Sequence, residues 1–103
     1  MSDWSDVDCI IIRRKINDDD TVEALEGRVV ENGVPREQPL ELSVAQVVDF
    51  IAQDGDFCTA RSGLNGLTRG GDLEIVDEGE RVRLRTVDGT QEKFQLEALP
   101  TYE

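Results

Sequence analysis

Hydrophobic residues recur along the chain with two different periods, which predict its strands and its helix. The segment VDCIIIRRKI, residues 7–16, holds four consecutive apolar residues and is typical of a strand covered on both faces. The segment NDDD, residues 17–20, favours a turn because short polar side chains bond their own backbone. Residues 21–33 combine Gly27 with two adjacent valines, which favours a second strand bent at a bulge. The first predicted unit is therefore a β-hairpin.

The segment LSVAQVVDFIAQDG carries the clearest local signal and predicts a helix over residues 43–54. Ser43 can cap the N-terminus while Gln46, three residues later, bonds back to it and completes a capping box. Gly55 fits a left-handed stop at the other end. The apolar positions form one stripe along the helix: Val44, Val47, Val48 and Ile51. This pattern indicates an amphipathic helix that lies on a sheet.

Segments rich in glycine and proline separate the remaining elements. NGVPREQP, residues 32–39, predicts a surface loop before the helix. DFCTARS, residues 56–62, predicts a strand with Phe57 on one face and Cys58 on the other. GLNGLTRGG, residues 63–71, holds four glycines, and we interpret it as a loop or an irregular edge.

A hairpin is expected near the C-terminal end, and the hydrophobic pattern predicts its register. A two-residue turn at 78–79 sets apolar residues opposite one another on one face and places arginines beside acids on the other. The predicted pairs are Leu73–Leu84, Ile75–Val82, Asp72–Arg85, Glu74–Arg83 and Val76–Arg81. The arginines at 83 and 85 therefore have expected acidic partners.

A second hairpin is expected at DGT, residues 88–90, because a three-residue loop keeps the apolar positions in phase. Together these elements predict an α+β fold, a single domain over residues 1–103 with a core at 7–100 and a tail at 1–6. An antiparallel sheet of about five strands packs on one helix, in the order β-β-α-β-β-β. The predicted core is Ile10, Ile12, Val44, Val47, Val48, Ile51, Phe57, Leu73, Ile75, Val82, Leu84, Phe94 and Leu96.

The net charge of the chain limits the classes of molecule that we expect it to bind. The chain has 23 acidic and 11 basic residues, a formal net charge of -12. Such a field repels phosphate backbones and anionic lipid, so we expect no direct binding to nucleic acid and none to membranes. The acidic start MSDWSDVD is not followed by an apolar stretch of the length that a signal peptide or a membrane span needs. A cytoplasmic location is the default expectation.

The sequence offers little catalytic chemistry. It contains no histidine, which removes the most common general base and the usual activator of a nucleophilic serine or cysteine. Cys9 and Cys58 have no CxxC spacing and lie in apolar runs, where a reduced thiol behaves as a small buried hydrophobe. The acids at 17–20 lack the pattern of an EF-hand loop, and the glycines at 63–71 lack that of a phosphate loop. We expect no enzyme activity, no cofactor and no metal site.

The segment ERVRLRTVDG raises one candidate binding site. It places three arginines at alternate positions of a strand: Arg81, Arg83 and Arg85. They can be the solvated face of an ordinary strand, or they can grip a carboxylate or phosphate, since clustered guanidinium groups bind anions bidentately. Arg13 and Arg14 would enlarge such a site if the first strand lay nearby. Both interpretations stay open.

The segments just described resemble a family of small bacterial domains of unknown function. Such domains have a strand hairpin, a helix, a strand with a YLRT-like motif and a closing NLxxLP element, and the resemblance covers roughly residues 8–101. The matching residues here are Leu84, Arg85, Thr86, Leu96, Leu99 and Pro100. Arg83 and Gln95 stand where that family has an aromatic residue and an asparagine. The resemblance implies bacterial origin and this architecture, and brings no activity, cofactor or catalytic residue.

We therefore expect a non-enzymatic accessory module that binds another protein. Trp4 and Tyr102, near the two ends, either cover the sheet edge or anchor the partner, because such aromatics dominate interface hot spots. One alternative is an acidic mimic of nucleic acid that inhibits a basic protein. The other is a small-anion site on the arginine stripe. Association of two copies stays open.

Overall fold

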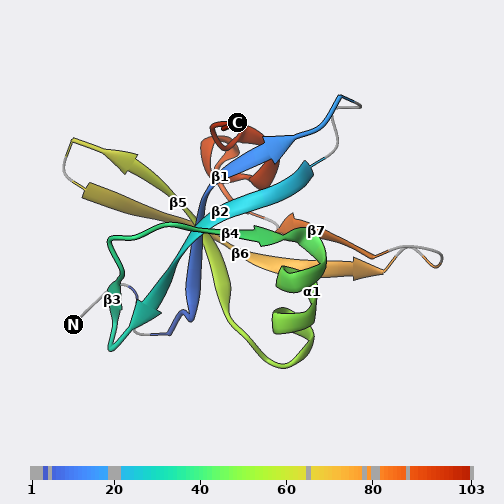
Figure 1. Ribbon diagram of the computed structural model, residues 1–103, viewed down its shortest axis with the longest axis horizontal. Helices are drawn as coiled ribbons and strands as arrows, with labels where there is room; N and C mark the ends of the chain where they lie inside the picture. Colours follow the sequence, from blue (N-terminus) through green and yellow to red (C-terminus); the bar gives the residue numbers. More distant parts are fainter. Residues whose placement is uncertain are drawn as a thin grey trace.

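One mixed, curled sheet forms most of the structure, with a single helix against one of its faces (Figure 1). The computed structural model describes residues 4, 6–18, 22–64, 66–77, 79, 82–87 and 89–102. In chain order the elements are β1 Cys9–Ile16, β2 Val22–Glu31, β3 Val34–Pro35, β4 Leu40–Ser43, α1 Val44–Ala52, β5 Phe57–Gly63, β6 Gly66–Asp77, β7 Val82–Thr86, and the 3-10 turns η1 Glu92–Phe94 and η2 Leu96–Ala98. The α+β class is as predicted.

The sheet topology differs from the prediction of an antiparallel sheet. The described strands number seven, in the order β3-β2-β1-β5-β6-β7, and β4 pairs with β2. β1 and β5 run parallel, with Cys9 opposite Phe57 and Ile10 opposite Cys58. The parallel pair arises because α1 carries the chain from β4, beside β2, back to a strand beside β1. The predicted sheet of about five antiparallel strands is therefore wrong in number and in direction.

The predicted first hairpin is confirmed, and it contains a bulge. β1 and β2 are antiparallel, and their register shifts because Ile11 pairs with Gly27 while Arg13 pairs with Glu26. The extra residue at this shift is Ile12 in β1, and a second shift near the turn leaves Glu23 as an extra residue in the second strand. Gly27 is required by close approach, because a Cβ there would lie 2.5 Å from the carbonyl oxygen of Ile10. Residues 19–21 of the turn lie outside the described residues.

The helix begins as predicted and ends differently. The Ser43 hydroxyl accepts a hydrogen bond from the Gln46 backbone at 3.1 Å, and the Gln46 side chain accepts one from the Ser43 backbone at 2.8 Å. At the other end Asp54, with φ of 68°, takes the left-handed position that we expected of Gly55. The Gly55 N–H instead donates to the Phe50 carbonyl at 2.8 Å, as in a Schellman motif.

The glycine-rich segment is a strand hairpin, so its prediction as a loop or irregular edge is wrong. Residues 66–71 belong to β6, and Gly63 pairs with Gly66 across a short turn. The glycines are needed because other segments pack directly on this backbone. A Cβ at position 70 would lie 2.6 Å from the Cβ of Phe94, and one at 71 would lie 2.0 Å from the hydroxyl of Thr90.

The C-terminal hairpin has the predicted faces in a register shifted by two residues. Asp77 pairs with Val82, so the loop is longer than the predicted two-residue turn. The observed pairs are Leu73–Thr86, Glu74–Arg85, Ile75–Leu84 and Val76–Arg83. The predicted third strand after residues 88–90 is also wrong, because that segment forms η1 and η2. Both registers keep apolar residues on one face, which is why the pattern did not distinguish them.

Buried residues form two clusters on opposite faces of the sheet. The larger, on the side of α1, contains Cys9, Ile11, Leu25, Leu42, Val47, Phe57, Leu73, Leu84, Leu96 and Leu99. The smaller contains Val7, Ile10, Cys58 and Ala60. Of the predicted core, Val82 is wrong, because it is 44% exposed at the strand edge, and Val44, Val48, Ile51 and Ile75 are only partly buried. Ile11, Leu25 and Leu99 are core residues that we did not predict.

Candidate functional site

An apolar groove lies where α1 meets the end of the first hairpin. It has a volume of about 340 Å³ and its lining is almost entirely hydrophobic: Asp8, Cys9, Val29, Val30, Leu40, Leu42, Phe50 and Phe57. β1, β2, β4, α1 and β5 each contribute to this lining or flank it. Several elements thus enclose one apolar space.

Phe50 places a large, exposed aromatic side chain at this groove, which is unusual in a protein with so polar a sequence. Its side chain lies at the margin of the helix stripe and is 53% exposed. The ring rests against Phe57, with the ring centroids 6.1 Å apart and tilted. A large aromatic residue off the Val44 stripe was visible in the sequence, but we did not recognise it as a candidate.

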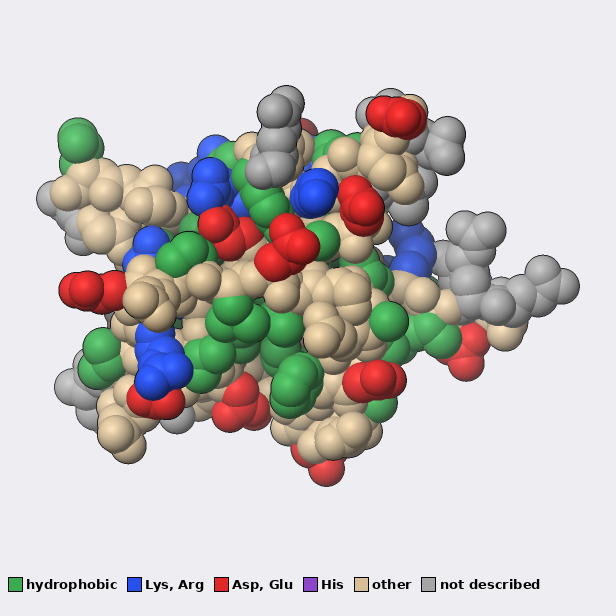
Figure 2. Space-filling model, viewed as in Figure 1, with side chains coloured by type: hydrophobic (Ala, Val, Ile, Leu, Met, Phe, Trp, Pro, Cys, Tyr) green, Lys and Arg blue, Asp and Glu red, His purple; other side chains and the backbone are tan. Residues whose placement is uncertain are grey.

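The charged residue in the lining of the groove is acidic. The Asp8 carboxylate lines it and accepts a hydrogen bond from the backbone N–H of Asp56 at 3.0 Å. Asp49 precedes Phe50 on α1 and is exposed. None of the described residues that line the groove is Lys or Arg. Figure 2 shows hydrophobic side chains over the middle of the view, with both acidic and basic side chains around them.

The arginine stripe is only partly a cluster. Arg81 lies outside the described residues. Arg85 pairs with Glu74, with the guanidinium Nε 2.5 Å from a carboxylate oxygen, whereas we expected Glu74 to pair with Arg83 and Asp72 with Arg85. Arg83 is exposed and lines, together with Arg85, a polar hollow of about 550 Å³ against η2.

Arg13 and Arg14 do not line the hollow of the arginine stripe. Arg13 forms a bidentate ion pair with Glu26, and its second hydrogen bond measures 2.7 Å. Arg14 points to the other face of the sheet, where its Nε donates to the Leu99 carbonyl at 3.0 Å. The predicted enlargement of one anion site by both residues is therefore not present in the described structure.

The two terminal aromatics both pack on the sheet. Trp4 is partly buried and covers the smaller hydrophobic cluster. Tyr102 continues beside β1: its backbone N–H donates to the Arg14 carbonyl at 2.9 Å, and its hydroxyl donates to Glu41 at 3.1 Å. Partial burial and this carboxylate raise the pKa of Tyr102 to about 12. Arg13 lies over the ring at 5.5 Å, so Tyr102 is already engaged within the chain.

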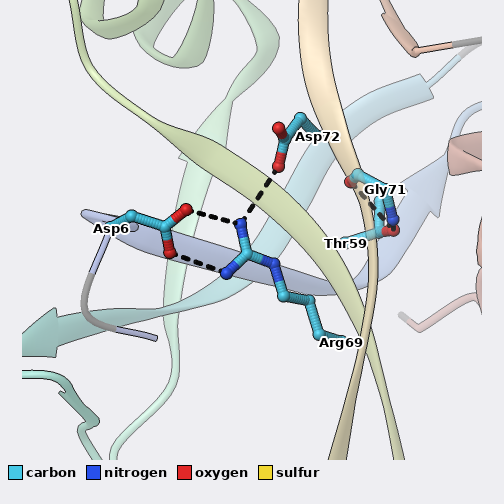
Figure 3. Close-up of polar contacts among 5 residues, drawn as sticks. All are labelled: Asp6, Thr59, Arg69, Gly71 and Asp72. Carbon is cyan, nitrogen blue, oxygen red and sulfur yellow. Dashed lines mark hydrogen bonds and ion pairs between the residues drawn. The ribbon is translucent and has the colours of Figure 1, made fainter. Parts of the chain in front are cut away.

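Two polar contacts that we did not predict tie β5 and β6 to distant segments (Figure 3). The Arg69 guanidinium binds Asp6 at 2.7 Å and Asp72 at 3.3 Å, and the hydrogen bond to Arg69 lowers the pKa of Asp6. The buried Thr59 hydroxyl lies 2.6 Å from the Phe94 carbonyl and 3.2 Å from the Gly71 N–H. Both contacts hold the N- and C-terminal segments on the sheet.

The cysteines are buried and free. They lie on neighbouring strands but on opposite faces, because Cys9 belongs to the larger cluster and Cys58 to the smaller. Burial raises the pKa of Cys9 to about 11 and that of Cys58 to about 12, so neither thiol is a nucleophile at neutral pH. Within the described part of the chain, no group of acids and cysteines has the arrangement of a metal site.

The described residues include no helix with the length and apolar character that crossing a membrane requires. Comparison of the sequence with protein-family models, curated proteins and solved structures finds no match. The resemblance to small bacterial domains of unknown function therefore stays a prediction. Functional inference rests on the groove, the hollows and the charges themselves.

Proposed function

We propose that this protein is a non-enzymatic module that binds another protein through the groove beside α1. The bound segment carries a bulky apolar side chain flanked by Lys or Arg. The half-exposed Phe50 at an apolar groove carries this proposal, because aromatic residues beside a pocket are the usual anchors of interfaces. An inserted side chain would bury the exposed part of the Phe50 ring.

Charge supports a basic partner. The chain has a formal net charge of -12, Asp8 lines the groove, and the Asp56 backbone is hydrogen-bonded to Asp8. Complementary charges at the rim steer encounter and discriminate against wrong partners more than they add affinity. An acidic segment with the same anchor would be repelled.

The acids visible on this face give less support to mimicry of nucleic acid. In Figure 2 they lie between hydrophobic and uncharged side chains and do not form one continuous ridge. A mimic needs carboxylates at phosphate-like spacing along one line. The apolar groove is the more specific feature.

Short fluorescein-labelled peptides test the proposal by anisotropy. One peptide carries a central Trp flanked by Arg and Lys, a second replaces the Trp by Ala, and a third replaces the basic residues by Glu. We expect the first to bind, the other two to bind at least about tenfold more weakly, and added salt to weaken the first. Phe50→Ser should reduce its affinity by about tenfold or more.

Val34→Ser is the matched control, because Val34 is also exposed and hydrophobic, at 62%, but lies on β3 and does not line the groove. Its affinity for the basic Trp peptide should equal that of the original protein. Absence of binding by all three peptides, or equal binding by the Phe50→Ser variant, would contradict the proposed function.

A further inference from the structure

A second hollow, with no residue of α1 in its lining, lies where β1 and β2 approach the end of β5 and Pro100. It has a volume of about 350 Å³, at the lower end for sites that hold small molecules. Its lining residues come from β1, β2, β5 and the adjoining segments: Ile12, Arg13, Glu26, Arg28, Pro39, Arg61, Ser62 and Pro100. Three arginines therefore face one glutamate in a protein whose formal net charge is -12.

Strand register brings these groups together. Arg28 lies opposite Ile10, and Ile10 belongs to the smaller cluster on the face away from α1. Glu26 lies on the same face, because residues two apart on a strand share a face. The bulge at Ile12 keeps Arg13 opposite Glu26. A bulge in one strand thus sets the ion pair beside Arg28.

Two of the three arginines already have acceptors. Arg13 is held by the two oxygens of Glu26. Arg61 donates from Nη1 to the Lys93 carbonyl at 2.9 Å, which satisfies an N–H group; no ion pair joins it to a carboxylate of the described residues. The hollow therefore keeps an excess of positive charge.

Arg28 is different. Its Nε is buried and has no hydrogen-bond partner among the described residues. A buried N–H of a charged group is unfavourable unless an acceptor is supplied, and native proteins leave few such groups unsatisfied. Nε and the adjacent Nη of a guanidinium form the fork that binds two oxygens of one anion.

We propose that this hollow binds a small organic anion through Arg28, with Arg61 as a second cation. The ligand carries a carboxylate or a phosphate, whose oxygens supply the acceptors that Arg28 lacks. Its short apolar part lies against Ile12, Pro39 and Pro100. Glu26 keeps Arg13 neutralised, so the site selects a small anion of low charge. This site is separate from the groove beside α1 and does not depend on the proposed function.

The test follows the arginine Nε–Hε signals by NMR during titration with inorganic phosphate or with propionate, at constant ionic strength kept by sodium chloride. We expect the Arg28 signal to shift and to saturate. Saturation by phosphate alone assigns a phosphate ester, saturation by propionate alone assigns a carboxylate, and saturation by both assigns a shallow oxyanion site. All three outcomes support the site.

Arg28→Gln should weaken binding at least about tenfold, followed through the Arg61 signal. Arg36→Gln is the matched control, because it removes the same charge from an exposed arginine that does not line this hollow. If Arg28→Gln does not fold, Arg61→Gln, followed through the Arg28 signal, takes its place. An Arg28 signal that neither probe moves beyond the effect of sodium chloride would overturn the proposal, as would equal weakening by the control.

Discussion

Different kinds of side chain lie over the two faces of the central strands. On the side of α1, the larger cluster is closed by the helix, η1 and η2, and its surface opening is the apolar groove at Phe50. On the other side, Trp4 packs on the smaller cluster of Val7, Ile10, Cys58 and Ala60. Arginines line the hollow beside this cluster. Strand alternation therefore places Ile11 and Ile10 in different clusters, with the apolar groove beside one cluster and Arg28 beside the other.

Core truncation on each face should show the largest difference. Leu25 is fully buried in the larger cluster, and Leu25→Ala should lower the free energy of unfolding by about 2–5 kcal/mol. Val7→Ala, in the smaller cluster, removes less buried surface and should cost about 1–2 kcal/mol. Urea denaturation measures both. Equal losses would mean that the two clusters contribute alike and would break the contrast between the faces.

Substitution of Thr59 tests whether polar contacts, as well as packing, hold the segment of Phe94 on the sheet. Thr59→Val keeps the shape but leaves the Phe94 carbonyl and the Gly71 N–H without this partner, at a cost of about 1–3 kcal/mol. Thr68→Val, at an exposed position of β6, should change stability little. A loss in Thr59→Val no greater than in this control would show that Phe94 is held by packing alone.

The two thiols, one on each face, give a smaller effect that is confined to alkaline pH. Their pKa values are raised from 9.0 to about 11 for Cys9 and about 12 for Cys58. Above pH 9 the unfolded thiols lose protons that the folded protein retains, so stability is complete below pH 9 and falls as pH rises toward the folded values. The loss is about 1 kcal/mol for each thiol by pH 10.

Urea denaturation at pH 8, 9 and 10 measures this loss in the original protein, Cys9→Ala and Cys58→Ala. Each variant should show a shallower decline, by about 1 kcal/mol at pH 10. The double variant should retain only the decline due to other groups, including Tyr102, whose pKa is also raised. An unchanged decline in either single variant would mean that its thiol is not buried as described.

Local signals in the sequence were enough to predict the helix and the first hairpin. Ser43 and Gln46 lie three residues apart and form the capping box without help from the rest of the chain. Most of the predicted core is buried, because alternation places residues such as Leu73 and Leu84 on the covered face in either register. The α+β class follows from these elements.

Long-range packing decided what the sequence did not predict. Four glycines indicated a loop, yet the residues at 70 and 71 are glycine because Phe94 and Thr90 lie against that backbone. Phe94 and Leu96 are buried as predicted, but in 3-10 turns, because burial at alternate positions does not specify a strand.

The candidate sites show the same limit. The arginines at alternate positions of residues 81–85 were recognisable as a candidate site from their spacing. Arg28 is recognisable as a candidate only when the positions of its neighbours in the fold are known. It shares a hollow with Ile12, Pro39 and Pro100, which are distant in sequence. Phe50 was recognisable in principle, as a large aromatic residue off the helix stripe.

One NMR experiment tests the separation of the two faces most directly. The basic Trp peptide and the anion probe are titrated into the same labelled protein, in either order. The peptide should shift the signals of Phe50 and its neighbours on α1, the anion should shift Arg28 and Arg61, and neither should change the affinity of the other. Shifts of one common set of residues by both probes, or of neither site, would contradict the assignment of two binding faces.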